Sequence, residues 1–261
     1  MTRKIWWSDF SAPDFAGVDP MLTVAMLPIA AIEQHGPHLP VGTDAILNLS
    51  CLDQLARELP PSFDLRILPI QQVGKSNEHL WAAGTVTHDA PTLIAAWTDL
   101  GMSVARAGIR KLVMINSHGG NEEVMGIVAR ELRVRADMLV VKTGWTRFPP
   151  ADGLVTERER RHGIHGGDIE TSLMLHFRPD LVDMARAADF VSRAAEDEDD
   201  FVHLRPTGTH AYAWIASDLN PAGAVGNAAA ASSEKGRILA ERQVAGMIEL
   251  LHEIRRARLP D

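Results

Sequence analysis

Four apolar segments that alternate with longer amphipathic segments constrain the fold of this 261-residue chain most strongly. The apolar segments are rich in aliphatic or β-branched side chains and span residues 21–32, 65–73, 111–115 and 138–142. Apolar residues at helical spacing fill residues 45–59, 91–107 and 122–134 between them. This alternation is typical of a parallel sheet joined by crossover helices. We therefore predict an α/β fold with a mainly parallel central sheet.

Each expected helix begins at a residue that can cap it. Thr43 or Asp44 can cap the first helix, Asp89 with Pro91 behind it the second, and Asn121 the third. Beyond residue 142 a Pro- and Gly-rich loop precedes a helix-like segment at 167–177, and an amphipathic helix at 234–258 ends the pattern.

The acidic run at 196–200, EDEDD, is typical of a solvated loop. The chain has neither an internal repeat nor an obvious linker between domains. A single domain over residues 1–261 is the expected organisation.

Composition argues against several classes of function. Lys and Arg total 26 against 34 Asp and Glu, a net charge of −8 without a basic block, which disfavours nucleic-acid binding. No run of 18 apolar residues or secretory signal is visible, so we expect no membrane association. The single cysteine, Cys51, excludes an intrachain disulfide, and the cytoplasm is the expected location.

The segment EQHGPHLPVGTD at 33–44 places metal-capable side chains directly after the first apolar segment. Glu33 and His35 are two residues apart, so in extended chain both point to the same side. Ligands of open parallel sheets bind at the carboxyl ends of the strands, where these residues lie. Asp44 follows a Pro- and Gly-containing turn at a helix start, where it either returns to the site or only caps the helix.

Two further clusters follow later in the chain. In NSHGGN, His118 comes after the third apolar segment and therefore reaches the same edge of the sheet. In RHGIHGGDIETSLML, the Gly-flanked His165 is a candidate general acid or base. Asp168 and Glu170 stand early in the next helix, where either one is also consistent with an ordinary helix residue. Ser76 and His79 lie in the loop after the second apolar segment, on the same side.

Oxygen and imidazole ligands without thiolate suit zinc, manganese or ferrous iron. Two His, one bridging Asp and two Glu are enough for two divalent ions with open positions for water. Such a pair of ions, roughly 3.5–4 Å apart, polarises a carbonyl and holds a hydroxide, so hydrolysis is the expected chemistry.

At these residues the sequence resembles the creatininase (creatinine amidohydrolase) family. EQHGPHLPVGTD, NSHGGN and HGGDIETSLML match its signatures in order, and EHLWAAGTVT and GAVGNAAAASSEKG are weaker matches. The resemblance implies a three-layer α/β sandwich with helices on both faces of the sheet, a two-metal centre and a compact homo-oligomer, favouring a hexamer. It also implies that Glu33, Asp44 and His118 hold the first metal. His35 would hold the second, with Asp44 as the bridge.

The chain departs from the family pattern at two positions. Creatininase has a metal-binding Glu where this chain has Gly120, and the resemblance implies Glu170 as the replacement ligand. Creatininase has a Tyr where this chain has Gly119, and its two substrate-stacking Trp residues correspond only to Trp145 and Trp214 as candidates. His165 matches a histidine that contacts substrate and handles protons, and Asp168 is a further carried-over contact. Creatinine is therefore not the expected substrate.

The predicted function is a metal-dependent amidohydrolase that cleaves a C–N bond of a small cyclic amide or formamide through a dinuclear-metal hydroxide. His165 would shuttle the proton to the leaving nitrogen, and Glu170 would assist. Two alternatives remain. The first is a hydrolase of a lactone or of a cyclic sugar-derived ketone that uses the same metals. The second is a catalytically inactive metal-binding sensor or scaffold.

Overall fold

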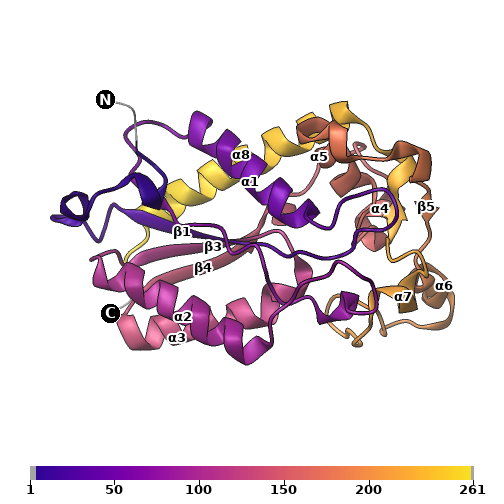
Figure 1. Cartoon of the computed structure of the whole chain (residues 1–261), viewed down its shortest axis with the longest axis horizontal. Helices are drawn as coiled ribbons and strands as arrows, with labels where there is room; N and C mark the ends of the chain where they lie inside the picture. The colour runs from indigo at the N-terminus through magenta and orange to yellow at the C-terminus, as the bar shows by residue number, and fades with distance from the viewer. Residues whose placement is uncertain (1–3, 260–261) are drawn as a thin grey trace.

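A four-stranded parallel sheet forms the centre of the computed structural model, which describes residues 4–259. Its strand order is β2-β1-β3-β4, and Figure 1 shows the sheet between two layers of helices. The strands are β1 (Val24–Ile29), β2 (Leu65–Ile67), β3 (Lys111–Asn116) and β4 (Leu139–Gly144). Each predicted apolar segment therefore overlaps one strand. β1 and β2 lie within their segments, β2 over only three residues, whereas β3 and β4 extend to Asn116 and Gly144, beyond the predicted ends at 115 and 142.

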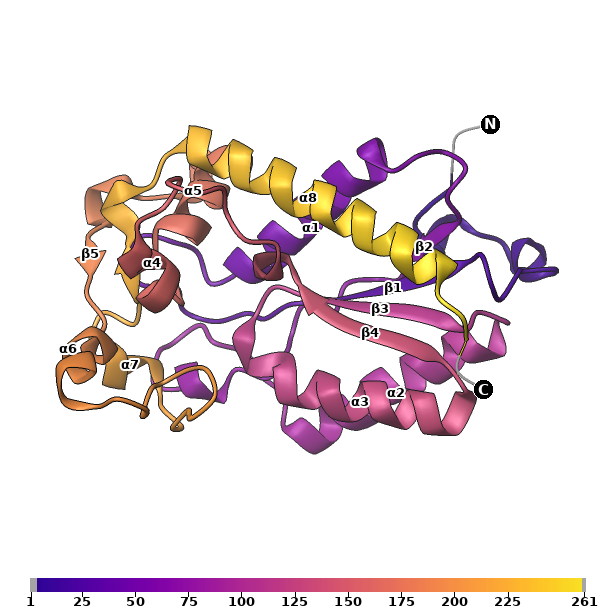
Figure 2. The same cartoon turned by 180° about the vertical axis from the view of Figure 1, so that it is seen from behind.

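Buried side chains alternate between the two faces of the sheet, as the period of a strand requires. On one face, Val113 and Ile115 pack with residues of α1 and α8, and on the other, Leu112 and Met114 pack with residues of α2 and α3. Figure 2 shows α8 crossing one face of the sheet while α3 and α2 cover the other. The four helices are α1 (Thr43–Glu58), α2 (Ala90–Arg106), α3 (Glu122–Ala136) and α8 (Ser233–Arg256). The predicted three-layer α/β architecture is confirmed.

Pro28 lies within the buried strand β1, where a missing N–H would ordinarily break a ladder. Its carbonyl accepts from Gln71 N–H on the β2 side, so its missing N–H faces that side as well. Because β2 ends at Ile67, Pro28 lies beyond the paired part of that edge.

Smaller elements gather beyond the carboxyl end of the sheet. They are α4 (Glu157–His162), α5 (Asp168–Phe177), α6 (Arg193–Asp200), α7 (Ala216–Leu219) and the antiparallel pair β5 (Asp189–Phe190) and β6 (Gly226–Asn227). The helix expected at 167–177 is therefore α5, which has Gly167 at its N-cap.

The prediction of a solvated loop at 196–200 is wrong, because this run forms most of α6. Ser192 caps α6 by accepting from Ala194 N–H, and Glu198 lies 3.4 Å from Arg161 Nη1 and 3.7 Å from Arg205 Nε. These basic partners come from other segments and offset part of the repulsion within the acidic run.

The expected capping residues also take other roles. Gly42, not Thr43 or Asp44, is the N-cap of α1. Asp89 and Asn121 do occupy the N-cap positions of α2 and α3, but neither side chain caps its helix. Within the described residues, no helix combines the length and apolar character needed to cross a membrane.

Candidate metal centre and active-site cavity

A cavity of about 720 Å³ lies at the carboxyl end of the sheet. Loops that follow β2 and β3 and the first turn of α3 form its sheet-end wall, and the segment at 206–215 forms its outer wall. Among its lining residues are Lys75, Glu78, His79, His118, Gly119, Gly120, Arg147, His165, Tyr212 and Trp214.

The turn after β1 folds back on itself and returns Asp44 to the strand end. Glu33 N–H donates to the Val41 carbonyl over 2.9 Å, and Gly36 at the bend has a φ of +70°, a conformation that favours glycine. Asp44 Oδ1 consequently lies 3.4 Å from His35 Nε2. The interpretation of Asp44 as a mere helix cap does not hold.

Among the ligand candidates, three buried atoms lack a hydrogen-bond partner within the described part of the chain: Glu33 Oε1, His35 Nε2 and Asp44 Oδ2. An unpaired polar atom in the interior is costly, and such atoms in native proteins call for an explanation. These three belong to residues whose ligand atoms lie within 4.8 Å of one another. The donor set therefore fits a divalent cation with oxygen and imidazole ligands.

Hydrogen bonds fix which nitrogen of each histidine faces this centre. His35 Nδ1 lies 3.0 Å from the Glu33 carbonyl, and His118 Nε2 lies 2.8 Å from the Lys75 carbonyl. A carbonyl only accepts, so these nitrogens carry a proton, and in the neutral imidazoles the lone pair is on His35 Nε2 and on His118 Nδ1. Metal-ligating histidines are held in this way in metalloproteins.

His118 Nδ1 lies 3.1 Å from Glu33 Oε1 and 3.6 Å from Asp44 Oδ2. Topology alone thus brings the NSHGGN motif to the first motif, as predicted. Both carboxylates also stand near the lone pair of His118. This is the arrangement expected of three ligands to one ion.

Electrostatics in the cluster favour added positive charge. Burial alone would lower the pKa of His35, but the Asp44, Glu170 and Glu33 carboxylates outweigh it and raise the pKa to about 10. Burial would likewise lower the pKa of His118, yet Glu33 raises it well above its usual value. Buried carboxylates without enough counter-charge hold protons on these imidazoles, and a divalent ion would displace them.

Glu170 joins the cluster from the first turn of α5. Its Oε2 accepts from Gly166 N–H over 2.5 Å, and its ligand atom groups with those of His35 and His165. Burial, with Asp44 nearby, raises the pKa of Glu170 to about 7. The structure therefore places Glu170 beside the candidate second-metal ligand His35.

The loop after β2 contributes Ser76, Glu78 and His79. The Ser76 hydroxyl donates to Glu33 Oε2, and Ser76 is fully buried. It therefore orients a ligand candidate, and it does not line the cavity as the predicted substrate contact would. His79 does line the cavity, with its Nε2 3.5 Å from Glu33 Oε1.

The side chain of Glu78 lies beside Gly120. A Cβ at position 120 would stand 2.4 Å from Glu78 Oε1 and 2.5 Å from His118 Nε2. Glu78 Oε1 is also 3.1 Å from His118 Nε2. Glycine at 120 therefore leaves room for the Glu78 carboxylate beside His118.

Two predicted substrate contacts lie elsewhere. Trp145 is 3% exposed, packs in the core between the sheet and α8, and donates from Nε1 to Asn48 Oδ1 over 3.1 Å. Asp168 is buried and pairs with Lys235 Nζ at 2.6 Å, which joins α5 to α8. Neither lines the cavity, so the structure corrects both assignments. Gly119 and Trp214 do line it.

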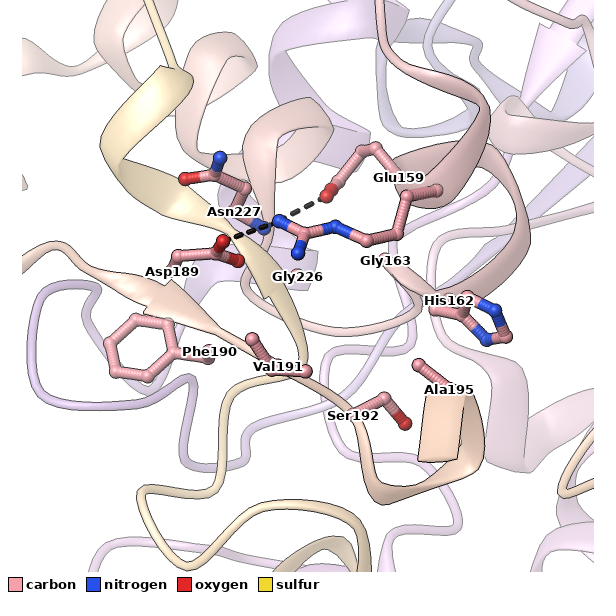
Figure 3. A pocket seen from close by; sticks show the side chains of 11 residues that line it. Glu159, His162, Gly163, Asp189, Phe190, Val191, Ser192, Ala195, Gly226 and Asn227 are labelled. Carbon is pink, nitrogen blue, oxygen red and sulfur yellow. Dashed lines mark hydrogen bonds and ion pairs between the residues drawn. The ribbon is translucent and has the colours of Figure 1, made fainter. Parts of the chain in front are cut away.

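A much smaller pocket of about 10 Å³ lies beside Glu159 (Figure 3). It has room for about one water molecule, so it is not a substrate site. The buried Glu159 carboxylate accepts from the backbone N–H groups of Asp168 and Asn227 over 2.7 and 2.8 Å. Glu159 therefore secures the loop that carries His165.

Residues that the motifs did not single out complete the site. Tyr212 lines the outer wall, and Asn121 holds two loops by accepting from Lys75 N–H and donating to the Ala30 carbonyl. Gln34 contacts both His79 and His165. Strand alternation points Gln34 away from Glu33 and His35, and the sequence does not show which loops pack on that side.

Comparison with known proteins gives concordant results. A sequence profile of the creatininase family, described as creatinine amidohydrolase, matches residues 8–251. Creatinine amidohydrolase of Pseudomonas putida is 30% identical over 96% of this chain and 95% of its own length. The mycofactocin precursor peptide peptidase of Mycobacterium ulcerans is 30% identical over 81% of this chain and 78% of its own.

Solved structures show the same fold. A creatininase in which one tryptophan is mutated to alanine matches with a TM-score of 0.78 and 26% identity, covering 97% of this chain and all of the other. Further matches at 27% identity, with TM-scores of 0.75 and 0.76, are a creatininase described as a manganese form and a glutamate-to-glutamine mutant described as a Zn-Zn type. They cover 96–97% of this chain and 98% of theirs.

Proposed function

This chain belongs to the creatininase family, and on that premise we propose that it is a metal-dependent amidohydrolase that cleaves a C–N bond of a small cyclic amide or formamide. The observation that carries the proposal is the convergence of Glu33 Oε1, His35 Nε2 and Asp44 Oδ2, buried and without hydrogen-bond partners among the described residues, beneath a cavity of about 720 Å³. The relatives named as manganese and zinc forms support a pair of such ions here.

Glu33, Asp44 and His118 would hold one ion, and His35 and Glu170 the other, with Asp44 shared. When bound, two divalent ions would polarise the substrate carbonyl and lower the pKa of a water. The Ser76 hydroxyl and the Glu33 and Lys75 carbonyls keep three of these side chains in their binding orientation.

His165 would move the proton between water and leaving nitrogen. Its Nε2 lies 2.7 Å from the Gln34 carbonyl, so its Nδ1 holds the lone pair, 3.5 Å from Glu33 Oε1. Burial and the nearby His35 lower its pKa well below the usual value, so His165 enters the reaction neutral. It would take a proton at Nδ1 from the attacking water and return it to the departing nitrogen.

The cavity is large enough for a planar amide substrate that is bigger than a single small ring. Pockets of roughly 300–1,000 Å³ are typical of drug-sized ligands. A Cβ at Gly119 would meet no atom within 4 Å, so the cavity is open there, and Tyr212 and Trp214 add flat aromatic surface to its lining. The size of the cavity and the similarity to a peptide peptidase favour hydrolysis of a short peptide's amide bond as a second candidate.

The proposal also covers the assembly, the location and the partners of the protein. As in the family, we expect a homo-oligomer, with a hexamer favoured, acting in the cytoplasm on a small molecule and without nucleic-acid or membrane partners. Sedimentation equilibrium of the purified protein checks the assembly, and a monomer would contradict it.

A direct test combines elemental analysis of protein purified without added metal with a hydrolysis screen. The panel contains cyclic amides, formamides and short peptides, together with lactones and cyclic ketones. We expect two divalent ions per chain and turnover of an amide. Turnover of only a lactone or ketone would support that alternative, and bound metal without any turnover would support an inactive sensor or scaffold. Full metal content and rate in His118→Ala would overturn the site assignment.

A further inference from the structure

Gln34 lies between the ligand candidates Glu33 and His35, is 7% exposed, and has both ends of its amide fixed. Its Oε1 accepts from Gly36 N–H over 2.8 Å, and its Nε2 donates to the Gly223 carbonyl over 2.9 Å. Rotating the amide by 180° would set Oε1 against that carbonyl and Nε2 against the Gly36 N–H. The amide orientation is therefore determined by its neighbours.

This orientation determines the tautomer of His79. Gln34 Nε2 lies 2.7 Å from His79 Nδ1, and an amide nitrogen only donates, so His79 Nδ1 accepts. The proton of neutral His79 is then on Nε2, which points at Glu33 Oε1 from 3.5 Å. Because 3.5 Å is long for a hydrogen bond, this N–H remains available to a ligand in the cavity.

The backbone of the same residue determines the tautomer of His165, which is also the Nε2–H form but turns its other nitrogen, Nδ1, toward Glu33. The Gln34 carbonyl accepts from His165 Nε2 over 2.7 Å, which leaves the lone pair of His165 on Nδ1. Gln34 Nε2 also lies 3.3 Å from His165 Nε2, but both atoms carry protons there, so this contact is not a hydrogen bond. The two imidazoles are adjacent, with ring centroids 4.4 Å apart.

We infer that Gln34 is a positioning residue that gives two neighbouring histidines opposite roles: His79 presents a fixed N–H to the substrate, and His165 presents a fixed lone pair. The inference rests on the proposed amide hydrolysis. His79 Nε2–H donates a hydrogen bond to the substrate oxygen on which negative charge develops, and it keeps its proton throughout. His165 accepts and returns the proton. A single ring nitrogen cannot serve both roles at once, because it carries either a proton or a free lone pair.

The tautomers are tested by long-range ¹H–¹⁵N correlation spectra of protein labelled with ¹⁵N-histidine. Spectra are recorded for the metal-free protein and for protein loaded with Zn²⁺, and the signals are assigned with His79→Gln and His165→Gln. We expect a protonated Nε2 on His79, and in Gln34→Met a mixture of the two His79 tautomers. A protonated Nδ1 on His79 of the unmodified protein, or an unchanged His79 tautomer in Gln34→Met, would overturn the inference.

Kinetics with the amide found in the screen test the roles. We expect His79→Gln to lower kcat by about 10²-fold, the usual effect of removing one donor to a developing oxyanion. Gln34→Met should lower kcat by roughly tenfold, since a mixture of tautomers still holds some of the active form. Both variants should keep two ions per chain and nearly unchanged KM. Unchanged kcat in His79→Gln would overturn its role.

Gln243→Met is the matched control, because Gln243 is a glutamine that is 2% exposed and contacts Cys51 in the core. It should lose stability while keeping kcat and the His79 tautomer. If the unmodified protein hydrolyses nothing, the proposed amidohydrolase fails, and the spectra still decide the tautomers. If it turns over an amide but the spectra show His79 Nδ1–H, the inference alone fails.

Discussion

The two walls of the cavity are built in different ways. The sheet-end wall contains His79 and His118, which lie next to Glu33, and the ligand candidates Glu33, His35 and Asp44 behind it are at most 1% exposed. The outer wall is the segment at 206–215, where most residues are exposed and Trp214 is held by one bond from Nε1 to the Pro206 carbonyl. Under the proposed function, we therefore expect bond cleavage to depend on the sheet-end wall and the residues behind it, and substrate choice to depend on the outer wall, since geometry is most exact on rigid elements.

The largest expected effect comes from Asp44→Asn, behind the sheet-end wall. Under the proposed function Asp44 would serve both ions, so its loss would remove several kcal/mol of charge stabilisation and should lower kcat/KM by about 10³-fold or more. Elemental analysis should show fewer than two ions per chain. A variant that keeps both ions and the full rate would show that the sheet-end wall is not the catalytic one.

Much of this wall is readable in the sequence, because parallel strands bring their carboxyl ends to one edge. The three motifs with Glu33, His118 and Glu170 follow β1, follow β3 and open α5, and topology then brings them together. What the sequence lacks is the partner of each side chain. Trp145 and Trp214 both follow from the sequence as loop aromatics, and only the structure shows that Trp145 packs in the core and donates to Asn48 while Trp214 lines the cavity. The acidic run forms most of α6, and its basic neighbours Arg161 and Arg205 come from other segments, which the sequence does not show.

The second effect concerns the rigidity of the same wall. His38, 2% exposed, contacts Thr171 Oγ1 at 2.9 Å and so joins the first motif to α5. Burial lowers the pKa of His38 to about 4, so the folded state disfavours the charged form. Above an unfolded pKa of about 6.5 its contribution is complete, and it is lost as pH falls toward 4.

Between pH 7 and pH 5, the free energy of unfolding should therefore fall by about 2 kcal/mol more in the unmodified protein than in His38→Gln. Urea titrations of the metal-free proteins at both pH values measure this difference. Equal losses in the two proteins would mean that His38 does not fix the wall in its neutral form.

On the outer wall, Trp214→Ala should change binding and leave chemistry alone. Loss of one aromatic contact is worth about 0.5–1.5 kcal/mol, so KM should rise up to about tenfold while kcat stays nearly constant. Trp81→Ala is the control, because Trp81 is 45% exposed and does not line the cavity. A fall in kcat without a change in KM would place Trp214 with the catalytic groups and end the division between the walls.

The smallest expected effect, that of Trp145→Phe, distinguishes the role of Trp145 from that of Trp214. Trp145→Phe keeps most of the packing against the core but removes the N–H that Asn48 Oδ1 accepts. An unsatisfied buried acceptor costs about 1–3 kcal/mol, and here the lower end applies because the aromatic ring is retained. Urea unfolding should show this loss, while KM stays that of the unmodified protein because Trp145 contacts no part of the cavity. If Trp145→Phe instead raises KM as Trp214→Ala does, the Trp145 side chain contacts the substrate. Trp145 would then belong to the substrate-binding residues and not to the core.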